Sequence, residues 1–315
     1  MPLSRRRFLS NGSAALAAVT VGCQTRRRRP EDVRDVAKVL AAVGSADGAG
    51  VKLRRALGSR TLPMLDPFLL LDEIQSADQA DFRAGFPTHP HRGFETVSYL
   101  ISGAFIHRDS VGNEGRIADG GTQWMTAGRG IVHSEMPEQK PGLELWGLQL
   151  WVNLPAKRKM TEPRYQDLAA SDIPELMVAD ARVRLVAGTI GRVKGPIDGV
   201  AVQPVMLDAS LEAGAQFRYQ LPTDHNAFVY VLSGAISLGA GADPVVAKQT
   251  AVLKPGRREI AASSAEGGRF LLLAAAPINE PVARRGPFVM NTRAELRQAF
   301  DDYRNGRLVR NNSPL

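Results

Sequence analysis

Cysteine is almost missing from this chain: Cys23 is the one cysteine among 315 residues. No disulfide can therefore stabilise the fold beyond position 23, and its stability has to come from hydrophobic cores and bound groups. Histidine is also scarce, with 5 in the whole chain. Closely spaced histidine pairs are uncommon by chance in such a sequence, so the one pair that occurs needs a chemical explanation.

An excess of positive charge is missing from most of the chain, although the formal net charge is +8. Seven of the 40 basic residues lie at positions 5–7 and 26–29, in a head that contains no acid, which leaves 33 basic residues against 32 acidic ones. The body of the protein is therefore nearly neutral. We expect no nucleic-acid binding through a broad basic face.

Long apolar runs are missing from the head, where AALAAVTVG has the length of a signal-peptide core rather than of a membrane span. The run follows SRRRFL, which resembles the twin-arginine export motif. We therefore expect residues 1–30 to be a twin-arginine-type signal segment and the protein to be exported to the periplasm or the cell surface. The alternative is a disordered basic tail.

Cys23 stands at the end of the same apolar run, where bacterial lipoproteins carry the cysteine that is acylated. A lipidated Cys23 would anchor the protein to a membrane. The preceding Val-Thr-Val-Gly is an imperfect lipobox, because a leucine and then a small residue would be expected before the glycine. Lipid anchoring therefore stays open.

Two short segments carry the main chemical signal. They are HPHRGFE, with His89 and His91, and GIVHSE, with His133 and Glu135. Residues two apart in a strand point to the same face, so each segment offers a pair of side chains to one point. Three imidazoles and one carboxylate suit a divalent first-row ion. The plainer reading is that all four are ordinary polar residues of strands and turns.

The residues between these pairs predict a barrel. TVSYLI is rich in β-branched and aromatic side chains, and Ser102-Gly103 follows it as a turn. Further short runs and turn residues lead to His133 without a long helical pattern. The spacing is that of antiparallel strands with tight connections, as in jelly rolls.

The sequence resembles the pirin family of the cupin superfamily. The segments that carry the resemblance are HPHRGFETVSYLISG, HRDSVGN, TQWMTAGRGIVHSEMPE, LQLWVNLP and NEPVARRGPFVMNTRAEL. The resemblance implies an all-β fold of two stacked cupin barrels, with iron in the first barrel. It places the family's metal ligands on His89, His91, His133 and Glu135. Glu95 is a ligand position in many other cupins, and we interpret it here as a polar group near the ligands.

Length and pattern divide the chain into two domains. We expect an N-terminal metal-binding cupin at 36–165 and a C-terminal cupin without a complete metal site at 172–310. A capping box from Thr292 to Glu295, followed by an apolar stripe of Leu296, Phe300 and Tyr303, predicts a short C-terminal helix.

The two remaining histidines are weak candidates for metal binding. His225 is the one histidine of the second half, and we interpret it as a turn or surface residue. His107 lies in the HRDS segment that resembles the family, and we interpret it as a structural hydrogen-bonding residue near the barrel mouth.

The resemblance implies an enzyme that opens the ring of quercetin-like flavonols, or of related enol and phenol substrates, with O2. In this reading the partners are a small aromatic molecule and O2, the protein is a monomer, and Glu135 is both a ligand and the base that takes the substrate's hydroxyl proton. We expect one divalent ion, Fe(II) before Mn, Ni, Co, Cu or Zn, all of which such a site would accept. The alternative is a metal-dependent binding or redox-sensing module without catalysis.

Overall fold

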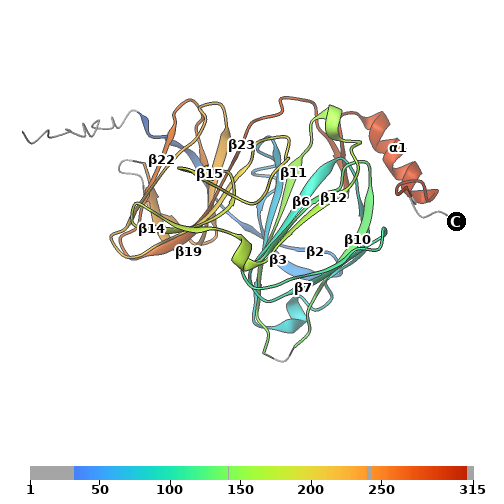
Figure 1. The fold of residues 1–315 in the computed structure, drawn as a ribbon, viewed down its shortest axis with the longest axis horizontal. Helices are drawn as coiled ribbons and strands as arrows, with labels where there is room; N and C mark the ends of the chain where they lie inside the picture. The colour runs from blue at the N-terminus through green and yellow to red at the C-terminus, as the bar shows by residue number, and fades with distance from the viewer. Residues whose placement is uncertain (1–31, 141, 240–242, 311–315) are drawn as a thin grey trace, which may run out of the picture.

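The computed structural model describes residues 32–140, 142–239 and 243–310, and it forms two β-barrels that lie side by side (Figure 1). The predicted all-β fold of two cupin barrels with a short C-terminal helix is confirmed. The expected signal segment and Cys23 lie outside the described residues. Among the described residues, no helix has both the length and the apolar character needed to cross a membrane.

The first barrel consists of a seven-stranded sheet facing a four-stranded one. The larger sheet has, in spatial order, β12 (Arg164–Leu168), β9 (Thr122–Thr126), β6 (Phe94–Ser102), β11 (Leu145–Asn153), β4 (Phe68–Ser76), β3 (Val51–Leu57) and β2 (Val43–Asp47). The smaller sheet has β5 (Phe86–His91), β10 (Ile131–Pro137), β7 (Phe105–Asp109) and β8 (Glu114–Ile117).

The second barrel repeats this plan. Its main sheet has, in spatial order, β1 (Val36–Ala41), β21 (Gln249–Leu253), β19 (Asn226–Leu238), β23 (Gly268–Ala275), β17 (Val205–Leu211), β14 (Ala181–Ala187) and β13 (Glu175–Val178). Joined to it are β18 (Gln216–Gln220), β22 (Glu259–Ser263) and β20 (Val245–Val246). Short hairpins are made by β15 (Thr189–Ile190) with β16 (Val193–Lys194) and by β24 (Ala283–Arg285) with β25 (Phe288–Met290). Short 3-10 turns lie at Gln79–Asp81, Ala156–Arg158 and Ala170–Asp172.

One edge strand crosses between the barrels. β1 precedes the first barrel in the chain but pairs with β21 of the second, whereas β12 follows the strands of the first barrel and pairs with β9 of that barrel. The domain ranges of 36–165 and 172–310 stay a prediction, with β1 lying in the first range although it pairs with the second barrel. The physical reason for the crossing is that β1 finds unpaired backbone partners at the edge of the second barrel.

Alternation along β6 explains how the barrels join. Val97 and Tyr99 face the second barrel and belong to a hydrophobic cluster shared with Phe228 and Tyr230 of β19, whereas Leu100 faces the interior of the first barrel. The Tyr99 hydroxyl donates to Asp208 of the second barrel, 2.6 Å away, and the Tyr230 hydroxyl donates to Glu73 of the first, 2.7 Å away. Buried polar groups at the junction are therefore paired across it.

The chain returns to the first barrel after the second is complete. β25 runs beside Arg92, and Lys159 donates its Nζ protons to the carbonyl oxygens of Gly93 and Val289, 2.8 and 3.0 Å away. Gly93 has a φ of 90°, and a Cβ there would collide with the Val289 carbonyl oxygen, so this close approach requires glycine. Helix α1 (Arg293–Arg304) follows, at the end of the first barrel away from the second (Figure 1).

Helix α1 begins as predicted. Thr292 accepts from the backbone of Glu295, and the Glu295 carboxylate accepts from the backbone of Thr292, which completes the capping box. Leu296 is buried as predicted, but Tyr303 is 41% exposed, and the small side chain of Ala299 is fully buried in its stead. The helix also holds the first barrel through an ion pair of 2.7 Å between Asp302 and Arg92.

Candidate metal centre

Three histidines meet where β5 and β10 run side by side. The antiparallel register places His133 opposite His89 and Ile131 opposite His91. Buried and half-buried residues alternate along β10, so His133 and Glu135 point into the barrel together, as the sequence predicted. His91 and His133 are buried, and His89 is half-buried.

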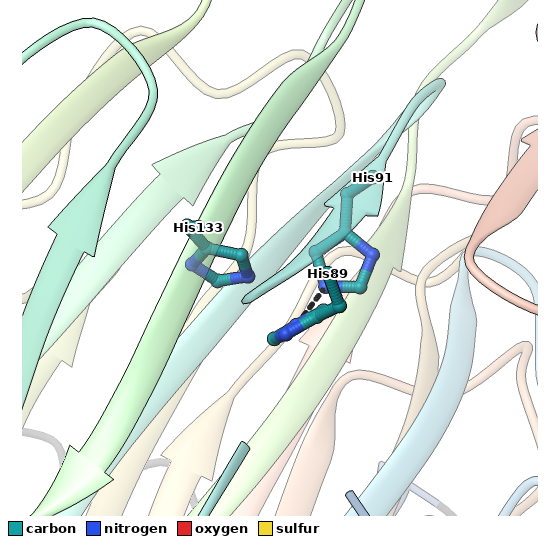
Figure 2. A group of neighbouring side chains, drawn as sticks. All are labelled: His89, His91 and His133. Carbon is teal, nitrogen blue, oxygen red and sulfur yellow. Dashed lines mark hydrogen bonds between the residues drawn. The ribbon is translucent and has the colours of Figure 1, made fainter. Parts of the chain in front are cut away.

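The ring nitrogens of these histidines converge. The ligand atoms of His89, His91 and His133 all lie within 4.8 Å of one another, and the Nε2 atoms of His89 and His91 are 3.0 Å apart (Figure 2). The Nε2 atom of His133 is buried and has no hydrogen-bond partner among the described residues. It is rare for a buried polar atom to lack a partner, and such an atom needs an explanation.

The opposite ring nitrogens show which atoms are free to bind a cation. The Nδ1 atom of His89 is 2.8 Å from the Pro87 carbonyl oxygen, and the Nδ1 atom of His91 is 3.4 Å from the Pro287 carbonyl oxygen. A carbonyl only accepts, so both Nδ1 atoms carry hydrogen and both neutral rings present an Nε2 lone pair. Two facing lone pairs repel each other unless a cation lies between them. The three Nε2 atoms therefore fit a metal ion.

The electrostatics of the site favour the form of histidine that binds metal. Burial lowers the pKa of His91 well below the usual range, and a charge on His89 would lower it further. Burial also lowers the pKa of His133 well below that range, with His91, His89 and His107 acting in the same direction. The two rings are therefore neutral at neutral pH, and neutral imidazole is the ligand form.

Glu135 is not part of the converging group. Its carboxylate oxygens accept hydrogen bonds from Ser98 Oγ and from Gln149 Nε2, the latter 2.9 Å away. The side chain lies on the same strand face as His133, so it borders the same interior. Its role as fourth ligand and base stays a prediction.

Glu95 lies elsewhere, and its interpretation as a group near the ligands is corrected. Its carboxylate accepts from Trp124 Nε1, 3.1 Å away, and from Thr126 Oγ1, 2.7 Å away. Alternation along β6 places Glu95 on the face of Val97, opposite the face of Ser98 that meets Glu135. Burial raises the pKa of this carboxyl group.

The two weak candidates have different surroundings. His107 is buried and makes hydrogen-bonding contacts with Tyr165 and His133, in agreement with a structural polar role. His225 lies in the second barrel outside the converging group; its side chain is 3% exposed and so is not a surface residue, but its backbone N–H donates to the Pro222 carbonyl oxygen, 3.3 Å away, at the end of a turn, as expected. Where the first barrel has β5 and β10, the second has β18 and β22, which contribute Phe217, Tyr219, Ile260 and Ala262 to its hydrophobic cluster and also bury Glu259, the ion-pair partner of Arg218.

A cavity of about 660 Å³ opens beside His89 and His91. Gln149 and Trp151 of β11 form part of its wall, and Arg284 and Pro287 reach it from beyond the second barrel. The Arg284 guanidinium lies 4.7 Å from the Trp151 ring centre and donates to the Leu69 carbonyl oxygen, 2.9 Å away. The chamber therefore combines an aromatic wall, a cation and the histidine cluster, an arrangement suited to a small aromatic molecule that carries hydroxyl groups.

Sequence reasoning missed the wall residues that come from far along the chain. Arg284 and Pro287 belong to a segment that follows the second barrel, and the Pro287 carbonyl meets a histidine 196 residues earlier. No local period encodes such a contact. Gln149 and Trp151 could have been found, because both belong to the alternating strand LQLWVN and point to one face.

The fold and the site together define a bicupin with a three-histidine cluster in its first barrel. Residues 50–152 match the Pirin family, and residues 206–309 match the Pirin C-terminal cupin domain. The chain is 45% identical over 277 residues to the pirin-like protein of Caulobacter vibrioides, covering 87% of this chain and 99% of that protein. The chain belongs to the pirin family.

Two further relatives illustrate what the family contains. Pirin of Rattus norvegicus is 39% identical over 267 residues, which cover 83% of this chain and 89% of that protein. The crystal structure of quercetin 2,3-dioxygenase from Acinetobacter baumannii superposes with a TM-score of 0.81 at 33% identity, covering 88% of this chain and 98% of that one.

Proposed function

We propose that this chain is a metal-dependent dioxygenase of quercetin-like flavonols or related enol and phenol substrates. Its ion would be divalent, Fe(II) before Mn, Ni, Co, Cu or Zn, and would be held by His89, His91, His133 and Glu135. The observation that carries the proposal is the convergence of ring nitrogens from three histidines, two of which, His89 and His91, line a chamber of about 660 Å³. The likeness to a quercetin 2,3-dioxygenase supports the substrate class.

A bound redox-active ion supplies Lewis acidity and a means of engaging O2. The chain's own residues supply the rest. Trp151, whose ring centre lies 5.3 Å from that of His91 and which packs against Phe94 and Arg284, offers an apolar wall that an aromatic substrate would contact. Arg284 offers a positive charge beside that wall, where a hydroxyl group that has lost its proton would be stabilised.

Glu135 would take that proton. Ser98 and Gln149 hold its two oxygens, so its orientation is fixed by hydrogen bonds rather than by chance packing. Gln149 lines the chamber and Glu135 lies behind it, so Glu135 would take the proton through one bridging water. A carboxylate that is buried and oriented in this way is suited to general-base catalysis.

The proposal is tested with iron-loaded protein under air and excess quercetin. We expect the flavonol absorbance to fall while equal amounts of O2 are consumed, and we expect neither change with a His89→Ala variant prepared in the same way. Protein that is fully loaded with iron but consumes no O2 and leaves the flavonol spectrum unchanged would favour the metal-dependent binding or redox-sensing module.

We also propose that residues 1–30 export the folded protein by the twin-arginine route. That route carries folded proteins, so the metal site would be filled in the cytoplasm, where competing ions are kept scarce. This matters because copper and zinc bind nitrogen ligands more tightly than iron does.

Fused to a reporter that must fold before export, residues 1–35 should direct it out of the cytoplasm. The change of both Arg5→Lys and Arg6→Lys should block export, because a receptor recognises the arginine pair and not its charge alone. The matched control is Arg26→Lys with Arg27→Lys, which conserves charge outside the motif and should leave export intact. Continued export of the first double variant would exclude the twin-arginine reading.

A further inference from the structure

His133 differs from the other two histidines in what lies behind its ring. Its Nδ1 atom is 3.4 Å from Nδ1 of the buried His107 on β7, and Nε2 of His107 is 3.2 Å from the Tyr165 hydroxyl on β12. Tyr165 in turn interacts with the carboxylate of Asp109, which, after burial, raises the pKa of the Tyr165 hydroxyl. An unbroken row of polar groups therefore leads from the candidate metal ligand to a carboxylate.

The chemistry of these groups fixes the direction of every bond. The Nε2 atom of His133 faces the other histidines without a partner, so a metal takes its lone pair there and the ring proton lies on Nδ1. His107 must then accept at Nδ1 and donate from Nε2. The Tyr165 hydroxyl oxygen accepts the hydrogen bond from His107, and its O–H points to Asp109, because an ionised carboxylate can only accept.

The far end of the row is itself held in place. Backbone N–H groups of Val111 and Asn113 donate to Asp109 Oδ1, each 2.9 Å away, and Asn113 Nδ2 donates to Oδ2, 2.7 Å away. Burial, and then the charge of Asp109, raise the pKa of Tyr165, so the phenol keeps its proton and remains a donor. The row ends in a fixed negative charge.

We propose that His107, Tyr165 and Asp109 are positioning residues that hold His133 in its Nδ1–H form and strengthen it as a metal donor. The inference rests on the proposed metal site. His89 and His91 face backbone carbonyls of Pro87 and Pro287, which are neutral acceptors. Of the three histidines, His133 is the one whose donor strength toward a metal depends on a charged side chain. The row behind it therefore sets the metal affinity of the centre.

His107 and Tyr165 can be replaced while all proposed metal ligands are kept. Both residues line a second cavity of about 320 Å³, which shares no wall residue with the chamber beside His89 and His91, so their replacement leaves the wall of that chamber unchanged. We expect Tyr165→Phe to weaken Co(II) binding about tenfold and His107→Leu about a hundredfold, the usual range for loss of an outer partner of a ligand. His107→Asn places an acceptor oxygen near the Nδ1 position, and its loss should be no larger than that of Tyr165→Phe. Co(II) affinity is measured by chelator competition, and the visible Co(II) spectrum reports the ligand field.

The matched control is Tyr219→Phe, which removes a buried hydroxyl that donates to the Thr189 carbonyl, 3.0 Å away in the second barrel. It should change neither Co(II) affinity nor spectrum. A purely structural role for the row would lower the unfolding midpoint of the metal-free protein and leave the Co(II) spectrum unaltered.

The proposal is overturned if Tyr165→Phe binds Co(II) as tightly as the parent, or if His107→Asn is as weak as His107→Leu. Tyr165→Phe keeps the test valid even if His107→Leu does not fold. None of these measurements needs a substrate, so a protein that binds metal through the row but does not oxidise quercetin would refute the proposed activity alone. Unchanged Co(II) affinity in His89→Ala would instead refute the histidine site.

Discussion

Replacing His133 by alanine is expected to remove most of the bound metal and all oxygenase activity while leaving a folded protein. The loss should exceed the ten- to hundredfold drop in affinity that follows removal of an outer partner, because a donor atom itself is lost. Folding should survive because the hydrophobic cluster of the second barrel and the cluster between the barrels contain none of the three histidines. Metal analysis, O2 uptake and circular dichroism test the three parts separately, and His89→Ala should behave alike.

The control for this change is His225→Ala. It also removes a buried imidazole with a ring nitrogen that has no partner among the described residues, but in the barrel whose equivalent strands contribute Phe217, Tyr219, Ile260 and Ala262 to a hydrophobic cluster. Its metal content should equal that of the parent. Equal metal loss in the two variants would mean that the first barrel does not hold the ion alone.

Glu135→Gln should lower flavonol turnover by about a hundredfold or more, the usual size of a general-base contribution. The amide keeps the size of the side chain and one oxygen that can still serve as a ligand, so part of the metal should remain. Gln149 and Ser98 can still bond to the amide, because each of these side chains can both donate and accept. Binding should therefore suffer less than turnover, and the two are separated by comparing kcat with the dissociation constant of quercetin.

Glu138→Gln is the matched control, since it makes the same chemical change three residues away, where the carboxylate pairs with Arg116 and Lys140 outside the cluster. It should leave turnover unchanged. Parental rates in Glu135→Gln would show that Glu135 is not the base, whatever its part in metal binding.

The local parts of this molecule could be predicted from sequence because they depend on period and spacing. A two-residue period placed His133 and Glu135 on one face of β10, and the capping box located the start of α1. The same period places Glu95 and Ser98 on opposite faces of β6, because three positions separate them and an odd separation reverses the face, but only the structure shows that Ser98 faces the site.

The contacts that could not be predicted join segments far apart in the chain. The crossing of β1 to the second barrel is decided by which barrel leaves an edge unpaired, and no local pattern records it. The Pro287 carbonyl behind His91 and the row behind His133 depend in the same way on how separate strands come together. The sequence indicated which residues donate to the metal, and the tertiary structure decided which groups hydrogen-bond to their rings from behind.

The return of the chain to the first barrel limits how this protein can be divided. A fragment that ends after β12 would keep all three histidines but would lack Pro287 and Arg284. It would also lack β25, whose Val289 carbonyl oxygen accepts from Lys159 beside Gly93. The second barrel lies in the chain between the histidines and the segment with Arg284 and Pro287. The chain has to pass through it before this segment returns to the chamber. For anyone seeking a minimal scaffold, the smallest unit with an intact site is both barrels together.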